Sequence, residues 1–294
     1  MGKFVDIRTD FGFKRIMGDE QLLLSFLNAM FEAEGKVITS VEYMDKEIIP
    51  IQEDERTTIF DIYCRVDKGE DFIVEMQQRT QTFFTKRTLF YMGRALGSQG
   101  EKGKEWEYNL RPVYGIFITD FTPPNLDDDM PVTEVALMVK QTCQYYTKDL
   151  RMFFINLKAF KKTSEDDCLN YLEKWIYNFK HMGEMTEKPK MAENTPFCLL
   201  YDRAEVAAMS EEDQIRWERS LKRYRDRLLY ETTLRMEQEE GMKKALEQGM
   251  AQGMAQGMAQ GISHTARKLI TEEGWSIEKA ASFFGLSPEE ITLD

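Results

Sequence analysis

Hydrophobic and polar residues alternate with two different periods along the first part of the chain, which indicates a mixture of helices and strands. Helical spacing with Asp19 as N-cap predicts an amphipathic helix over 20–32, and a second helix is predicted over 83–96. A third helix is expected after the capping-box sequence of residues 164–167, with apolar residues 169, 172, 176 and 179 on one face. Short apolar runs predict strands at 37–51, 57–66, 70–77, 113–119, 133–142 and 152–157.

The second and third of these strands are separated by Asp67-Lys68-Gly69, a loop that favours a β-hairpin. A three-residue loop with glycine in its last place suits a type I turn closed by a left-handed glycine. In that register Asp61 lies directly opposite Glu75. Because side chains alternate between the two faces of a strand, Gln77 shares the face of Glu75.

After a polar segment at 180–194, for which we predict a loop, the pattern becomes almost purely helical. A charged helical run extends from Ser210 to about Leu246, and four large residues in it are spaced like a coiled-coil seam. These residues are Trp217, Leu221, Tyr224 and Leu228. Residues 247–261 repeat Gly, Met, Ala and Gln with a period of four, and each helical glycine costs roughly 0.5–1 kcal/mol relative to alanine. We expect a helix that needs a partner here, with a frayed linker as the alternative.

The alternation of β-rich and helical segments predicts an α/β or α+β fold with an appended C-terminal helical arm. We expect a main domain at 1–190, a charged helical region at 191–246 and the repeat, as a helix or linker, at 247–262. A small helical hairpin is expected at 263–294.

Charge is distributed unevenly along the chain. It has 39 basic and 51 acidic residues and a formal net charge of −12, which argues against a protein that coats DNA regardless of sequence. Yet the segments 79–104 and 140–162 each hold six basic residues and one acid. Two basic stretches on an acidic chain are compatible with one phosphate-binding surface, although solvated faces are the commoner outcome.

Several classes of site and location are disfavoured by composition. The two histidines lie far apart, which excludes histidine-rich zinc sites and His–Cys nucleophile pairs. The four cysteines have no CxxC spacing, which favours a reducing compartment. We find no apolar signal core and no apolar run of membrane-spanning length, so we expect a cytoplasmic protein without membrane association.

Asp61 and Glu75 are the pair best suited to chemistry. Directly opposed β-carbons lie roughly 4.5–5.5 Å apart, so two carboxylates there repel each other unless a cation lies between them. Mg²⁺ binds a few carboxylates together with waters and phosphate oxygens. Apolar neighbours such as Phe60 and Val74 would make unpaired buried carboxylates costly. The sequence therefore predicts a divalent-metal site, and the alternative is an exposed pair on the wet face of an edge hairpin.

A series of spaced motifs carries a resemblance to a known family. They are Thr9-Asp10-Phe11-Gly12-Phe13-Lys14-Arg15-Ile16-Met17-Gly18, Leu27-Asn28, Phe60-Asp61, Glu75-Met76-Gln77 and Lys86-Arg87-Thr88-Leu89-Phe90-Tyr91. Over roughly the first 190 residues the chain resembles the Rpn family of recombination-promoting nucleases and transposase-like proteins, within the PD-(D/E)XK nuclease superfamily. The resemblance implies a central mixed sheet flanked by helices, and Mg²⁺-dependent endonucleolytic hydrolysis of DNA in recombination or mobile-element activity.

Under this resemblance Asp61 and Glu75 match the metal-ligating acids, and Gln77 stands where the wider superfamily has lysine. A neutral amide can orient water or phosphate, but it cannot supply charge or act as a base. Either Lys14 or Lys86 could replace the missing charge.

The remaining candidates precede and follow the acid pair in the sequence. Arg87 is expected to contact phosphate, and Tyr91, one turn further on, either stacks on a base or packs in the core. Asp10 is either an additional acid or a helix cap. The predicted partners are DNA and a second copy of the chain bound through the helical arm. The alternative function is a catalytically decayed nuclease-like protein that assembles through this arm, which the net charge and Gln77 favour.

Overall fold

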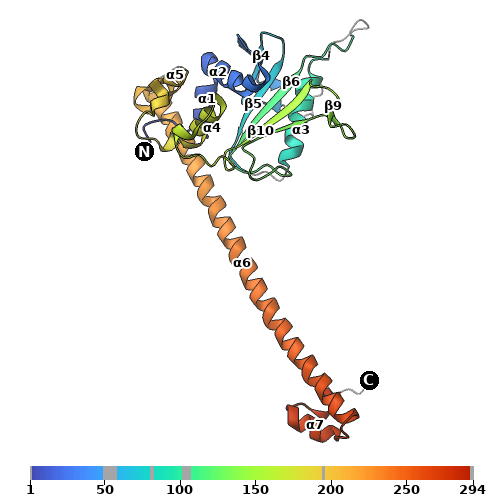
Figure 1. The fold of residues 1–294 in the computed structure, drawn as a ribbon. Coiled ribbons are helices and arrows are strands. Elements are labelled where there is room, and N and C mark those ends of the chain that lie inside the picture. Colours follow the sequence, from blue (N-terminus) through green and yellow to red (C-terminus); the bar gives the residue numbers. More distant parts are fainter. Residues whose placement is uncertain (1, 49–57, 80–82, 101–106, 194–195, 292–294) are drawn as a thin grey trace. The chain divides into compact units, whose positions relative to one another are not determined.

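The structure is a computed structural model that describes residues 2–48, 58–79, 83–100, 107–193 and 196–291 (Figure 1). The chain divides into two compact units, Met1–Tyr224 and Arg225–Asp294. All four cysteines are free. Within the described ranges no helix is both long and apolar enough to cross a membrane.

A six-stranded mixed sheet forms the centre of the first unit, in the strand order β1-β4-β5-β6-β10-β7. Its strands are β1 (Val41–Tyr43), β4 (Ile62–Val66), β5 (Asp71–Gln77), β6 (Val113–Thr119), β7 (Val132–Ala136) and β10 (Leu150–Asn156). The three central strands β5, β6 and β10 are parallel, and the remaining pairs are antiparallel. Two small two-stranded sheets pair β2 (Glu47–Ile48) with β3 (Thr58–Ile59) and β8 (Met138–Val139) with β9 (Gln144–Tyr145).

Helices cover both faces of this sheet, so the expected α/β fold with a central mixed sheet is confirmed (Figure 1). One face packs against α1 (Asp10–Met17), α2 (Glu20–Phe31) and α4 (Tyr171–His181), and the other against α3 (Phe84–Gly97). Strand β5 shows the alternation that this layering requires. Phe72, Val74 and Met76 belong to the core beneath α1 and α2, whereas Ile73 belongs to the core beneath α3.

The local signals for α2 and β6 are confirmed. The carboxylate of Asp19 accepts hydrogen bonds from the amides of Gln21 and Leu22 and so caps α2. All seven residues of β6 are buried, as a continuous apolar run predicts for a central parallel strand.

Two short helices were not predicted. Helix α1 begins after Thr9, whose hydroxyl accepts a hydrogen bond from the amide of Gly12, and α5 spans Phe197–Ala204. Each has eight residues, which is too short to give a clear helical period.

Other boundaries differ from the expectations. The predicted strand 57–66 divides into β3 and β4 at Phe60 and Asp61, and residues 49–57 lie outside the described ranges. The prediction at 133–142 was too long, because β7 ends at Ala136 and a separate short strand, β8, follows.

The segment between β10 and α5 also differs. Ser164 caps a 3₁₀ turn, while α4 begins after Asn170; Leu169 is 86% exposed and does not belong to the buried face. The expected loop at 180–194 contains further 3₁₀ turns, because Met182 and Met191 are buried in the core.

Helix α6 (Glu211–Thr271) begins in the first unit and continues into the second. Trp217, Leu221 and Tyr224 are buried in the core of the first unit, whereas Leu228 is 40% exposed. The coiled-coil interpretation was therefore wrong for Trp217, Leu221 and Tyr224, because these three residues pack against their own domain.

The second unit contains the rest of α6 and a short helix, α7 (Ile277–Phe284). Its small core is formed by Ala266, Ala280, Ala281 and Ile291. Gly274 and Gly285 lie at the two ends of the segment containing α7 and have φ angles of 70° and 69°, a conformation that favours glycine. Residues 247–261 are helical and exposed along their whole length.

Candidate active site

The site is built on the β4–β5 hairpin, whose predicted register is confirmed. Ile62 pairs with Val74 and Tyr63 with Ile73, as the three-residue loop predicts. The loop closes at Gly69, which has a φ of 86°. Glu75 lies two residues after Ile73 and so shares the sheet face covered by α3, and Asp61 lies directly before β4.

Two reciprocal hydrogen bonds connect Asp61 with β5. The backbone N–H of Asp61 donates to Oε1 of Glu75 over 2.9 Å. The backbone N–H of Met76 donates to Oδ2 of Asp61 over 3.1 Å. Each carboxylate therefore accepts a hydrogen bond from the main chain at or next to the other acid, and the structure brings the two carboxylates together.

Burial makes this pair costly to ionise. The side chain of Glu75 is only 2% exposed, and burial, followed by the charge of Asp61, raises the pKa of Glu75 to about 8. Burial also raises the pKa of Asp61, against the opposing effects of the Met76 amide and the charge of Lys14. Burial thus opposes ionisation of both acids, and the charge of Asp61 adds to this effect for Glu75, so a bound cation would favour the ionised pair.

Gln77 and Arg87 complete the polar cluster. Nε2 of Gln77 donates to Oε2 of Glu75 over 3.0 Å, and the guanidinium of Arg87 donates to Oε1 of Gln77 over 3.4 Å. The guanidinium also lies 3.8 Å from Oε2 of Glu75. The Gln77 amide thus bridges the Glu75 carboxylate and the Arg87 guanidinium. Its nitrogen, a donor, faces the carboxylate, and its oxygen, an acceptor, faces the guanidinium.

Tyr91 packs beside this cluster. Its ring lies edge-on to Phe60 at a centroid distance of 5.3 Å, and the Arg87 guanidinium lies 4.9 Å from its centroid. Of the two roles considered for Tyr91, the observed contacts are those of packing.

Lys14 and Asp10 approach the site from α1. They form an ion pair of 2.7 Å one helical turn apart, and Thr9 rather than Asp10 caps the helix. Burial opposes protonation of Lys14, but its hydrogen bond to Asp10 and the charges of Asp10, Asp61 and Glu75 raise its pKa overall. Lys14 is therefore close enough to act electrostatically on both acids.

Lys86 has a different position. Its side chain is exposed, and its ammonium lies 5.7 Å from the ring centroid of Phe83. Arg87, the next residue along α3, is the one that contacts the acid pair.

Asp120 is a neighbour of the site that sequence reasoning missed. Its backbone N–H donates to the carbonyl of Gln77 over 3.0 Å, and its carboxylate accepts a hydrogen bond from the Tyr224 hydroxyl over 3.1 Å. It lies 4.0 Å from the guanidinium of Arg8, and burial raises its pKa. The available signal was its place directly after a buried strand, where polar residues of parallel strands gather at one sheet edge.

The acids present limit how a metal could be held. Among the residues that the structure describes, no group of three or more His, Cys, Asp and Glu side chains has the arrangement of a metal site. A two-carboxylate site remains compatible with Mg²⁺, which takes its other ligands from water and phosphate.

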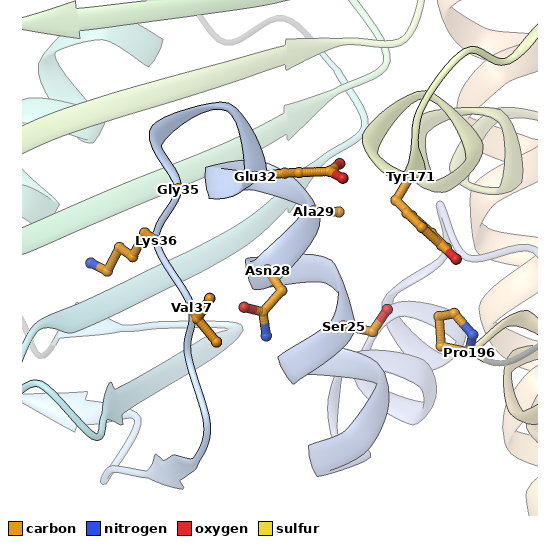
Figure 2. Close-up of a pocket in the computed structure, with 9 residues that line it drawn as sticks. All are labelled: Ser25, Asn28, Ala29, Glu32, Gly35, Lys36, Val37, Tyr171 and Pro196. Atoms are coloured by element: carbon orange, nitrogen blue, oxygen red, sulfur yellow. The ribbon is translucent and has the colours of Figure 1, made fainter.

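The cavity shown in Figure 2 lies elsewhere in the first unit, between α2 and the start of α4. It has a volume of about 470 Å³, and Asn28 and Tyr171 are among its lining residues (Figure 2). The Asn28 side chain is occupied by hydrogen bonds to the backbone of Ile38 and Leu24. Asn28 therefore has a structural role that accounts for its place in the sequence motif.

The first unit is thus an α/β domain with a mixed sheet covered by helices and two acids that meet at the β4–β5 hairpin. The chain belongs to the family described as "PD-(D/E)XK nuclease family transposase", whose model matches residues 7–232, well over half of the sequence. This match confirms the resemblance inferred from the motifs. No curated protein and no solved structure shows significant similarity to the chain.

Proposed function

We propose that this protein is a Mg²⁺-dependent DNA endonuclease that acts in the cytoplasm in recombination or in the movement of mobile elements. The observation that carries the proposal is the pair of main-chain hydrogen bonds to the two carboxylates, which hold the buried Glu75 beside the half-buried Asp61. Membership of the nuclease family supports hydrolysis as the reaction.

Asp61 and Glu75 are the residues that would hold the metal. Each of their oxygens has two lone pairs, and the hydrogen bonds described above leave lone pairs available on both carboxylates. A bound divalent cation supplies a water of lowered pKa and neutralises charge on the phosphate.

The neighbouring side chains have distinct roles in this proposal. Gln77 orients the attacking water or a phosphate oxygen, because its amide is fixed between Glu75 and Arg87. Arg87 stabilises negative charge that develops on the phosphate. Lys14 supplies the positive charge that the superfamily lysine provides elsewhere, while Lys86 contributes to DNA binding from the exposed side of α3.

The test is cleavage of supercoiled plasmid DNA by the full-length protein with and without Mg²⁺. We expect Asp61→Asn and Glu75→Gln each to abolish cleavage, while Asp128→Asn, which changes an exposed carboxylate outside the site, retains it. Unchanged cleavage by the two site variants would contradict the proposal. Calorimetric titration with Mg²⁺ separates the enzyme from a decayed, non-catalytic relative, because only the enzyme requires metal binding that is lost in Glu75→Gln.

We also propose that α6 mediates self-association. Met250, Met254 and Met258 are 67%, 75% and 67% exposed on this helix. A β-carbon added at Gly249, Gly253 or Gly257 would meet no neighbouring atom, so the described chain itself offers no reason for glycine there. A partner helix that approaches closely would explain both features.

A further inference from the structure

The outward face of α3 exposes aromatic rings near Arg87, the residue of this helix that contacts Glu75. Phe83, directly before the helix, is 67% exposed and Phe90 is 51% exposed, whereas Phe84 between them is buried in the core. At both positions more than half of the phenylalanine's surface is exposed in the described chain, so packing in the core uses only part of each ring.

The charge of this helix differs from that of the whole protein. Residues 83–97 contain Lys86, Arg87 and Arg94 and no acidic residue, in a chain of net charge −12. The Lys86 ammonium lies over the ring of Phe83, so a cation and an aromatic ring share one exposed position. A polyanion fits this surface better than an acidic or purely apolar protein partner does.

The two kinds of side chain follow the helix side by side. Arg87 and Arg94 are two helical turns apart, a separation of about 10 Å along the axis. Phe83 and Phe90 have the same sequence spacing. Arg87 contacts Glu75, so this double row of cations and rings begins at the proposed catalytic acids.

We propose that this face of α3 binds unpaired bases of a DNA strand next to the phosphate to be cleaved. The strand's phosphates lie along Arg87 and Arg94, and its bases stack on Phe83 and Phe90. In a duplex the base faces are hidden by their neighbours, whereas in a single strand every base offers a face for stacking irrespective of sequence. The proposal rests on the proposed function and adds its substrate class, which is single-stranded or locally unpaired DNA.

Binding to fluorescent oligonucleotides, measured by anisotropy with the full chain in EDTA, tests this without requiring cleavage. We expect an oligo-dT strand to bind more tightly than a duplex of equal length. Phe83→Ala and Phe90→Ala should each weaken single-strand binding roughly 5- to 100-fold and leave duplex binding nearly unchanged. Phe90→Trp should retain binding. Tyr146→Ala, which removes a ring that is 78% exposed elsewhere, serves as the control.

Three outcomes would overturn the inference. The first is a wild type that does not bind single strands. The second is single-strand binding by both alanine variants with the affinity of the wild type. The third is an equal loss of affinity for single strands and duplexes, which would indicate duplex DNA as the occupant. Thermal melting of each variant establishes that it is folded. Because the assay contains no metal, its result is independent of whether the plasmid assay shows cleavage.

Discussion

The backbone N–H of Asp61 lies 2.9 Å from Oε1 of Glu75 and donates a hydrogen bond to it. The main-chain amide of Asp61 thus positions the carboxylate of Glu75, and both residues are proposed to bind the metal. Main-chain donors are held by the sheet itself, so the carboxylates need little rearrangement when a ligand binds. This arrangement has a cost in the metal-free protein, because burial opposes the ionisation of both acids.

Glu75→Gln should therefore stabilise the metal-free protein at alkaline pH. The pKa of Glu75 is raised from its ordinary value near 4.5 to about 8, so the folded state favours the protonated form. The wild type is most stable below the pKa that Glu75 has in the unfolded chain. Its free energy of unfolding decreases as the pH rises toward the pKa of Glu75 in the folded protein. The glutamine variant does not titrate. We expect the difference in the free energy of unfolding to grow between about pH 5 and pH 8, by at least about 1 kcal/mol.

Thermal or urea unfolding of both proteins in EDTA across this pH range measures the effect. Addition of Mg²⁺ should reduce the difference at pH 8, because a metal that binds ionised Glu75 stabilises only the wild type. A difference that stays constant with pH would show that Glu75 ionises normally.

Substitutions of Arg87 and Lys86, which are adjacent on α3, should have different effects on the kinetics of cleavage. Arg87 lies 3.8 Å from Glu75 and bonds Gln77, so Arg87→Gln should lower kcat for plasmid cleavage about 100-fold. Arg87 also lowers the pKa of Glu75. Its loss should therefore move the increase in rate that accompanies ionisation of Glu75 to a higher pH. Arg87→Lys should recover activity only in part, since lysine lacks the planar fork.

Lys86→Gln is the matched comparison, because this ammonium lies over Phe83 and not at the acids. It should raise KM and reduce the salt dependence of binding with kcat unchanged within about 2-fold. Equal effects of the two substitutions on kcat would contradict the different roles assigned to them.

Local signals in the sequence were sufficient for the acid pair. A three-residue loop fixes the register of the hairpin, and this register, continued by one pair beyond Ile62 and Val74, brings residues 61 and 75 together. Asp120 and Tyr224 could not be paired in this way, because they are far apart in sequence and meet only through the fold. The misassigned role of Trp217 has a related cause. The same spacing of large residues arises whether a helix packs on its own domain or on a second helix.

Tyr224→Phe tests whether the link between α6 and the edge of the sheet is structural. The hydroxyl donates a 3.1 Å hydrogen bond to the carboxylate of Asp120, whose backbone in turn bonds Gln77. Removing a hydrogen bond to this half-buried carboxylate should lower the free energy of unfolding by about 1–2 kcal/mol. We expect kcat to stay within about 3-fold of the wild type. Tyr230→Phe, at an exposed position of the same helix, should leave stability unchanged in urea titrations.

The exposed methionines of α6 provide the test of self-association. If a second copy covers this face, charges placed there must be desolvated on association and should weaken it. Met254→Glu combined with Met258→Glu should move the full-length protein toward monomer in light scattering at several concentrations. The control is Gln252→Glu combined with Gln256→Glu, which adds the same charge at exposed positions of the same repeat. Retained association in this control, together with loss in the methionine variant, would assign the contact to the methionine face. A wild type that is monomeric at every concentration would exclude it.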